Sequence, residues 1–530
     1  MTVAYGAYAA RAGLEALARG GNAIDAALAT ALTQVALTGG APISYFGILS
    51  LIYYDARTGK IETMNANWNT VKGETDPRTI PGGIDLSDER RLGTTPSGRT
   101  ALVGGFIKGV EAAHRRFGKL PFRVLFDPAI HVAEHGMPVT KALAAQFMMR
   151  APDLARLPAT RANLLKPDGS PYREGETFRQ PALARTLRAV ASQGADYMYR
   201  GLWARRLVAA VQADGGKMTL DDLAGYEVIW GPPIHGRVGD YQIATLPPPN
   251  YGGVGMIEAQ NLAAAAGLVR DQQWSQSPVA LRKAATATQA WILGLIPEAA
   301  RRQLYPEMDL SDSARITMDH ARALWSLIDA GKLPVKWAEE GPKHSDDVVV
   351  IDSEGNMAAL TQSINCVIWG KTAINVDGVS IGDPASFQQA QIAAAGPGKR
   401  LPDPTETGLL LRDGKPVLAF ASMGAGLHQR TFQGLLNVAV HGMTVDQAID
   451  APDFFLPTLD PRAGGYVLAV PEGRFPKSVL DGTGIKYLEV GGEGARFGGE
   501  GVWVAISRDP KTGELRAASH NRSNSAALAY

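Results

Sequence analysis

The first clear hydrophobic pattern in the chain is an uncharged stretch over residues 26–54. Glycines and a proline at 39–42 interrupt it, whereas a membrane-spanning helix needs about 20 predominantly apolar residues in a row. The pattern therefore predicts a buried, alanine-rich helix followed by a buried strand. The strand is the largely apolar segment 48–55, and a turn leads from it into a second strand at 61–64.

The pattern of hydrophobic and polar positions changes along the chain. From residue 104 to about residue 335 it is mostly helical. After residue 345 short apolar strands recur, with helices near 429–441 and 444–450 among them. A helical block followed by a strand-rich block, with early strands as well, predicts α+β layers rather than alternating βαβ units. The later strands are expected at 348–352, 357–364, 408–412, 416–421, 466–470 and 502–507.

A short polar loop leads into one of these strands within Lys343–Asp352. Ser345 is a hydroxyl residue at the mouth of the strand, and the segment 357–364 is its hairpin partner. This arrangement suits a self-cleaving hydrolase, in which the bond before a Ser, Thr or Cys is cut and the freed α-amine serves as the base. An α-amine has a pKa of roughly 7.7–8.0, so it accepts a proton near neutral pH without a histidine. The alternative is a polar loop that simply precedes a strand.

Charge and cysteine content exclude several classes of protein. The chain has 53 basic and 52 acidic residues, a net charge of +1, which argues against nucleic acid or a membrane surface as the main partner. Cys366 is the only cysteine, so neither an internal disulfide nor a cysteine-built metal site is expected. The first residues lack the charged segment and apolar core of a signal peptide. We therefore expect a soluble, cytoplasmic protein with no metal and no organic cofactor.

Short motifs of glycine, proline and acidic residues recur along the whole chain. They are Gly20–Ala27, Gly105–Gly109 with Phe117–Pro121, Asp127–Ile130, Gly194–Gly201, Leu220–Tyr226, Pro247–Gly253, Asp413–Pro416 and His441–Pro452. In this order and spacing the motifs resemble the γ-glutamyltranspeptidase family, including its branch of oxamate amidohydrolase-like proteins. Their number and order carry the resemblance, which runs from the first helix to the last strands.

The resemblance implies a fold and a nucleophile. The family fold is a four-layer αββα sandwich of the N-terminal nucleophile hydrolases, divided by self-cleavage into a large fragment, here 1–344, and a small fragment, here 345–530. The family nucleophile is a threonine, and it stands seven residues before the Asp that ends the first strand of the small fragment. Counting back from Asp352 gives Ser345, which has the needed hydroxyl and lacks only the methyl group of threonine. A heterodimer of the two fragments is expected, and a dimer of such heterodimers is also open.

The family's supporting groups carry over to further positions. Ser363 matches a hydroxyl residue that hydrogen-bonds the nucleophile, and Asn365 matches an asparagine beside the substrate. Both would otherwise be alternating polar positions of a half-exposed strand. Gly424 and Ala425 match paired glycines whose backbone N–H groups form the oxyanion hole, and Ala425 keeps the N–H.

Two charged groups that bind a γ-glutamyl substrate in the family have no clear counterpart here. The arginine that binds the α-carboxylate falls on Asn67, and a neutral amide does not replace a bidentate guanidinium. The acidic position falls within Pro384–Phe387, so Asp383 is the nearest candidate. Ser422 and Met423, directly before the oxyanion pair, complete the expected substrate-binding set. A smaller or less charged amide than glutathione is expected.

The leading hypothesis is an autoprocessed amide hydrolase that cleaves a small amide or a γ-glutamyl-type amide through a serine acyl-enzyme. A cephalosporin acylase-like enzyme and a classical γ-glutamyl hydrolase or transferase are alternatives. A catalytically inactive family member with a binding or structural role is an alternative of another class. The pair Asp346–Asp347 motivates it, because the family has an uncharged residue and an aromatic or His there.

Three other patterns compete for a function. Gly378–Gly382 has the Gly-x-Ser-x-Gly form of an α/β-hydrolase nucleophile elbow around Ser380, but no parallel-sheet pattern accompanies it. Gly252–Gly255 suggests a phosphate loop but lacks the Lys-Ser/Thr ending. His131 and His135 stand four residues apart on one predicted helix face and could bind a metal, but no third ligand is in view.

Overall fold

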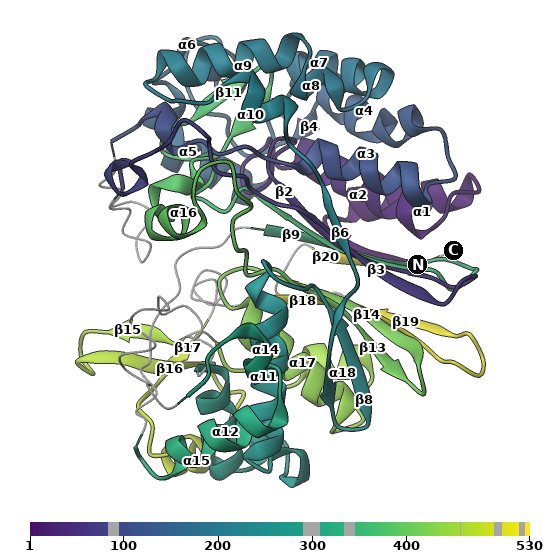
Figure 1. Cartoon of the computed structure of the whole chain (residues 1–530), viewed down its shortest axis with the longest axis vertical. Coiled ribbons are helices and arrows are strands. Elements are labelled where there is room, and N and C mark those ends of the chain that lie inside the picture. The colour runs from purple at the N-terminus through teal and green to yellow at the C-terminus, as the bar shows by residue number, and fades with distance from the viewer. Residues whose placement is uncertain are drawn as a thin grey trace.

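The computed structural model of the chain describes residues 1–82, 95–289, 308–332, 345–455, 457–491, 501–518 and 525–529. Two β-sheets lie against each other, and helices cover the outer side of each sheet, which gives the four layers of an αββα sandwich (Figure 1). The predicted α+β fold class is confirmed.

One helical layer contains α1 (Ala7–Ala18), α2 (Ala23–Leu37), α3 (Phe106–Phe117), α4 (Asp127–His135), α5 (Lys141–Leu154), α6 (Pro158–Leu164), α7 (Pro181–Gln193), α8 (Asp196–Tyr199), α9 (Leu202–Ala213) and α10 (Leu220–Ala224). The other contains α11 (Tyr251–Ala265), α12 (Pro278–Gln289), α14 (Asp312–Arg315), α15 (Met318–Asp329), α17 (Leu427–Ala439) and α18 (Val445–Asp450).

Both sheets combine strands from before and after residue 345, and all their strand pairs are antiparallel. The two expected fragments would therefore share one sandwich. In spatial order, the first sheet is β20 (Ser525–Leu528), β1 (Thr2–Tyr5), β9 (Ser345–Ile351), β10 (Met357–Ser363), β2 (Ile48–Asp55), β3 (Lys60–Ala66) and β6 (Ile229–Gly231). The second sheet is β19 (Leu515–Ala518), β18 (Val502–Arg508), β14 (Lys415–Met423), β13 (Glu406–Arg412), β8 (Tyr241–Thr245) and β7 (Ile234–Val238).

Smaller elements lie outside the two large sheets. They are the pairs β4 (Met137–Pro138) with β5 (Thr177–Phe178) and β11 (Ile374–Val376) with β12 (Val379–Ile381), the sheet β15 (Thr458–Asp460), β16 (Gly465–Pro471) and β17 (Tyr487–Val490), and the helices α16 (Gln389–Ala395) and α19 (Lys477–Gly482). No helix in the described ranges is long and apolar enough to span a membrane.

Several strands depart from the sequence-based expectation. The block from 104 to 335 was predicted to be mostly helical, yet β6, β7 and β8 lie within it and extend both sheets. The short strands β1 and β20 were not predicted. Each of these strands has three to five residues, too few for a period-two pattern to stand out from its surroundings.

The strand β9 is buried on both faces, which explains its continuous apolar sequence. Its alternate residues Val349 and Ile351 point toward the second sheet, where they pack in one cluster with Leu409. Val348 and Val350 point the other way and pack in the cluster that contains α2. The space between the sheets is thus apolar around the far end of β9, and Ser345 lies at the other end of the strand.

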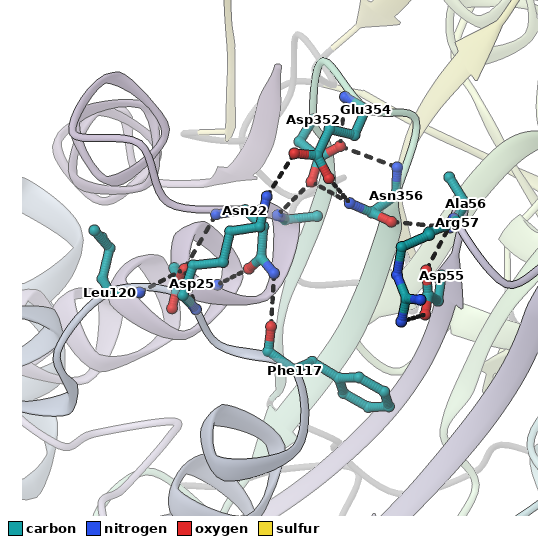
Figure 2. Close-up of polar contacts among 12 residues, drawn as sticks. Asn22, Asp25, Asp55, Ala56, Arg57, Phe117, Leu120, Asp352, Glu354 and Asn356 are labelled. Atoms are coloured by element: carbon teal, nitrogen blue, oxygen red, sulfur yellow. Dashed lines mark hydrogen bonds and ion pairs between the residues drawn. The ribbon is translucent and has the colours of Figure 1, made fainter.

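The Gly20–Ala27 motif holds α2 against the hairpin of β9 and β10 (Figure 2). Asn22 caps the helix by accepting a hydrogen bond from the Asp25 N–H at 3.1 Å, and Asp25 accepts one from the Asn22 N–H in return. The Ala23 N–H donates to the Asp352 carboxylate at 2.9 Å, and that carboxylate also accepts from the Asn356 side chain. This motif therefore has a structural role: it fixes the hairpin whose other end carries Ser345.

Candidate active site

Ser345 is the first residue of β9 and faces the second sheet. It lies opposite Ser363 of β10, which in turn lies opposite Ile48 of β2. The Gly424 N–H donates a hydrogen bond to Ser345 Oγ at 3.3 Å. Ser345 is partly exposed, whereas the six residues after it in β9 are buried.

The loop that contacts Ser345 connects β14 to α17. Gly424 has a φ of 86°, a left-handed conformation that glycine adopts without strain, and it turns the chain so that its N–H points at the serine. Ala425 follows it and is likewise partly exposed. Two successive N–H groups next to a nucleophile can form an oxyanion hole. The structure thus brings together Ser345 and the Gly424–Ala425 pair named from the sequence.

Ser363 and Asn365 lie on the same side of this site. The Asn365 N–H donates to Ser363 Oγ at 2.8 Å, and Asn365 has a φ of 44°, which bends the chain away from β10. The Asn365 side chain donates to the Asp403 carboxylate at 2.5 Å. Asp403 also accepts from the Thr405 N–H at 2.9 Å. Asp403 was missed from the sequence, because a loop ahead of β13 delivers it and no motif marks it.

Asn67 belongs to a buried group of amide side chains next to the end of β3. Its Oδ1 accepts from Ser50 Oγ at 3.0 Å, and its amide group donates to Asn250 Oδ1 at 3.4 Å. Asn65 also donates to Asn250 and accepts from Arg400. Asn67 is therefore engaged within the protein, and the nearby cation is Arg400, a residue that the sequence analysis did not single out.

Arg400 is held by neutral acceptors. Its guanidinium donates to Asn69 Oδ1 at 2.7 Å, to the Asn65 carbonyl at 2.6 Å and to the Glu227 carbonyl at 2.6 Å. It also stacks 4.8 Å from the ring centre of Tyr226. Among the described residues no ion pair joins it to a carboxylate, so its charge is balanced by oriented dipoles and the aromatic ring.

The remaining substrate-binding candidates have other partners. Asp383 is buried, accepts from the Lys371 and Thr372 N–H groups at 2.6 and 3.0 Å, and has its pKa raised by burial. Ser422 accepts from Thr431 of α17 at 2.7 Å, on the helical side of the second sheet. Met423 is buried at the end of β14. No hydrogen bond among the described residues joins these three side chains to Ser345, and their roles stay predictions.

Two buried acids follow the nucleophile. Burial raises the pKa of Asp347 to about 8, although a hydrogen bond from Thr361 opposes the shift. Burial also raises the pKa of Asp346 well above its usual range, and the charge of Asp347 adds to this effect. Burial thus disfavours the charged form of both acids that follow the nucleophile.

The competing patterns have structural roles in this fold. Ser380 lies inside the short strand β12, buried, and not on a turn between a strand and a helix. The glycines of Gly252–Gly255 start α11 in close contact with backbone, since a Cβ on Gly252 would lie 2.1 Å from the Pro404 carbonyl oxygen. His131 and His135 stack on each other, and the described part of the chain has no cluster of metal-ligating side chains.

These features define a class of protein: an αββα sandwich with a hydroxyl residue at the start of a central strand and a backbone N–H aimed at it, as in N-terminal nucleophile hydrolases. The model of the γ-glutamyltranspeptidase family matches residues 9–530. The chain belongs to the γ-glutamyltranspeptidase family, as its sequence motifs predicted.

Individual relatives span nearly the whole chain. The glutathione hydrolase proenzyme of Bacillus subtilis strain 168 is 27% identical over 549 residues, which cover 98% of this chain and 89% of that protein. The acylase ACY 1 proenzyme of Pseudomonas sp. strain SE83 is 29% identical over 473 residues, which cover 84% of this chain and 80% of that protein. The crystal structure of a cephalosporin acylase from Bacillus halodurans superposes with a TM-score of 0.80 at 23% identity, covering 100% of this chain and 95% of that chain.

Proposed function

We propose that the chain is a self-cleaving amide hydrolase with Ser345 as its nucleophile. The observation that carries the proposal is the Gly424 N–H, which points at Ser345 Oγ at the first residue of a central strand. Cleavage before Ser345 would give fragments 1–344 and 345–530. His344, on the other side of the scissile bond, lies outside the described residues. The word proenzyme in the names of the relatives agrees with processing.

Processing and turnover use the same hydroxyl. In processing, Ser345 Oγ bonds to the carbonyl carbon of residue 344, the C–N bond breaks, and water hydrolyses the resulting ester. The free α-amine then takes the Oγ proton as Oγ attacks the substrate amide. The N–H groups of Gly424 and Ala425 stabilise the oxyanion, each contributing roughly 3–4 kcal/mol where such donors have been tested. The leaving amine departs with that proton, and water releases the acyl group.

The substrate we propose is a small amide, as in the oxamate amidohydrolase-like branch. Asn67 stands where the family's carboxylate-binding arginine is expected, and its amide is bonded to Ser50 and Asn250. Asp403 places a carboxylate next to Asn365, which disfavours a second anion at that point. The likeness to acylase ACY 1 makes an acylase activity the second candidate. We propose further that the two fragments stay together and that the enzyme acts in the cytoplasm.

The experiment is N-terminal sequencing of the purified protein followed by assay of ammonia release from a panel of small amides. The small fragment should begin Ser-Asp-Asp-Val, and Ser345→Ala should abolish both cleavage and turnover. Ser345→Thr is the matched variant that should retain part of both, because it keeps the hydroxyl. An intact chain after long incubation would favour the inactive, binding or structural role.

A further inference from the structure

Asp347 occupies the polar end of the space between the two sheets. It stands two residues after Ser345 in β9, so both side chains lie on the same face of the strand. Its exposed fraction is 0%. In register it lies opposite Thr361 of β10, just as Ser345 lies opposite Ser363. A fully buried acid two positions from a nucleophile is costly unless its proton is controlled.

The two oxygens of Asp347 differ in their surroundings. Thr361 Oγ1 donates to Oδ1 at 2.5 Å and lies 2.9 Å from Oγ1 of Thr407 in the second sheet. The other oxygen, Oδ2, is buried and has no hydrogen-bond partner among the described residues. One half of the carboxyl is therefore fixed by a threonine that reaches both sheets, and the other half can hold or release a proton.

We propose that Asp347 is a positioning residue for the α-amine of Ser345: after cleavage, the two groups form a coupled pair in which the carboxylate stabilises the ammonium that forms as the amine takes the Oγ proton. This inference rests on the proposed function, because the amine exists only in the cleaved protein. Asp347 would act on the amine as the triad aspartate acts on its histidine in serine proteases.

The size of the coupling follows from strand geometry. Positions two apart on a strand are separated by roughly 6–7 Å. A unit charge at that distance in a protein changes the pKa of its neighbour by about one to two units. The carboxylate favours the ammonium, so it raises the pKa of the amine and makes it a stronger base. The enzyme would gain rate at high pH, and its activity would begin at a higher pH than without Asp347.

Asp403 is another acid at this site, and its carboxylate accepts from the Asn365 side chain and from the Thr405 N–H. On β10 and β13 the facing side chains are Thr361 and Thr407, which do not titrate in the relevant range. Asp346, the next acid on β9, lies on the opposite face, toward α2. Glu406 of β13 points to the other side of its sheet, where it bonds His428. Within β9, Asp347 is thus the acid that lies on the same face as Ser345.

The test is the pH profile of kcat/KM for the best amide of the panel, in wild type and Asp347→Asn. The variant keeps the shape and a polar contact for Thr361 but cannot ionise. Its acidic limb should lie about one to two pH units below that of wild type, and its plateau should fall by up to about 10- to 100-fold. A purely structural role would lower the whole profile without moving the limb, and that result would overturn the inference.

A second pair of variants tests the proposal if the Asp347→Asn variant does not fold or is not cleaved. Thr361→Val removes the hydrogen bond that favours the carboxylate, so its acidic limb should also move down. Thr361→Ser keeps the hydroxyl and should retain the wild-type limb. Equal limbs in the Val and Ser variants would refute the proposal. Absence of cleavage in wild type would instead refute the proposed function, and sequencing of the small fragment tells the two failures apart.

Discussion

Replacing Arg400 with lysine should destabilise the protein through loss of the guanidinium fork. The fork donates to Asn69, to Asn65 and to the Glu227 carbonyl, and it stacks on Tyr226. A lysine ammonium can keep one of these bonds but cannot reach acceptors in three directions from one plane. Hydrogen bonds from charged donors contribute about 1.5–3 kcal/mol each, so loss of two should cost about 3–6 kcal/mol.

The assay is thermal unfolding in a Ser345→Ala background, so that one intact chain unfolds. The entropy of unfolding of a chain of 530 residues is about 1 kcal/mol per kelvin, which converts the loss into a drop in Tm of about 3–6 °C. Arg412→Lys is the matched control, since Arg412 stacks on Tyr241 at 5.5 Å but is exposed. It should change the Tm by less than about 1 °C. Equal melting of the two variants would refute the role given to the Arg400 contacts.

Two further predictions follow from the buried acids and from the Gly-x-Ser-x-Gly pattern. The pKa of Asp347 is about 8 in the folded protein and about 3.9 when unfolded, so its stabilising contribution is full below pH 4 and is lost as the pH rises through 8. The measurement is the free energy of unfolding by denaturant, in the Ser345→Ala background, with Asp347 and with Asp347→Asn. Between pH 5 and pH 8 this free energy should fall by on the order of a few kcal/mol more in the protein that keeps Asp347. Equal decreases in the two proteins would contradict this. Ser380→Ala should leave kcat/KM within about twofold, because its hydroxyl lies in a buried hairpin; a loss of activity with cleavage intact would revive the α/β-hydrolase hypothesis.

The long apolar strands could be predicted from the sequence, and the order of the motifs predicted the family. The strand expected at 48–55 has those bounds, and the hairpin after Ser345 was placed within three residues. Asp347 could also have been placed, because period two puts it on the face of Ser345. Asp403, Asn250 and Arg400 could not, since they reach the site through loops whose position depends on pairing between distant segments. Asp383 was chosen because it lies close in sequence to the family's acidic position. In the structure its carboxylate instead accepts from the backbone of residues 371 and 372, which closeness in sequence did not predict.

The order of strands in the first sheet imposes a sequence of events on synthesis of the chain. β1 and β2 are made long before β9 and β10, yet β9 and β10 lie between them in the sheet. The N-terminal amine of Met1 donates to the carbonyl of Ile351, 350 residues away. Such distant pairings form late, after the loop entropy between them has been overcome. A nascent chain therefore has an unfilled gap in this sheet until residue 363 has been made, and the hydroxyl that would cut the chain enters its site only as that gap closes.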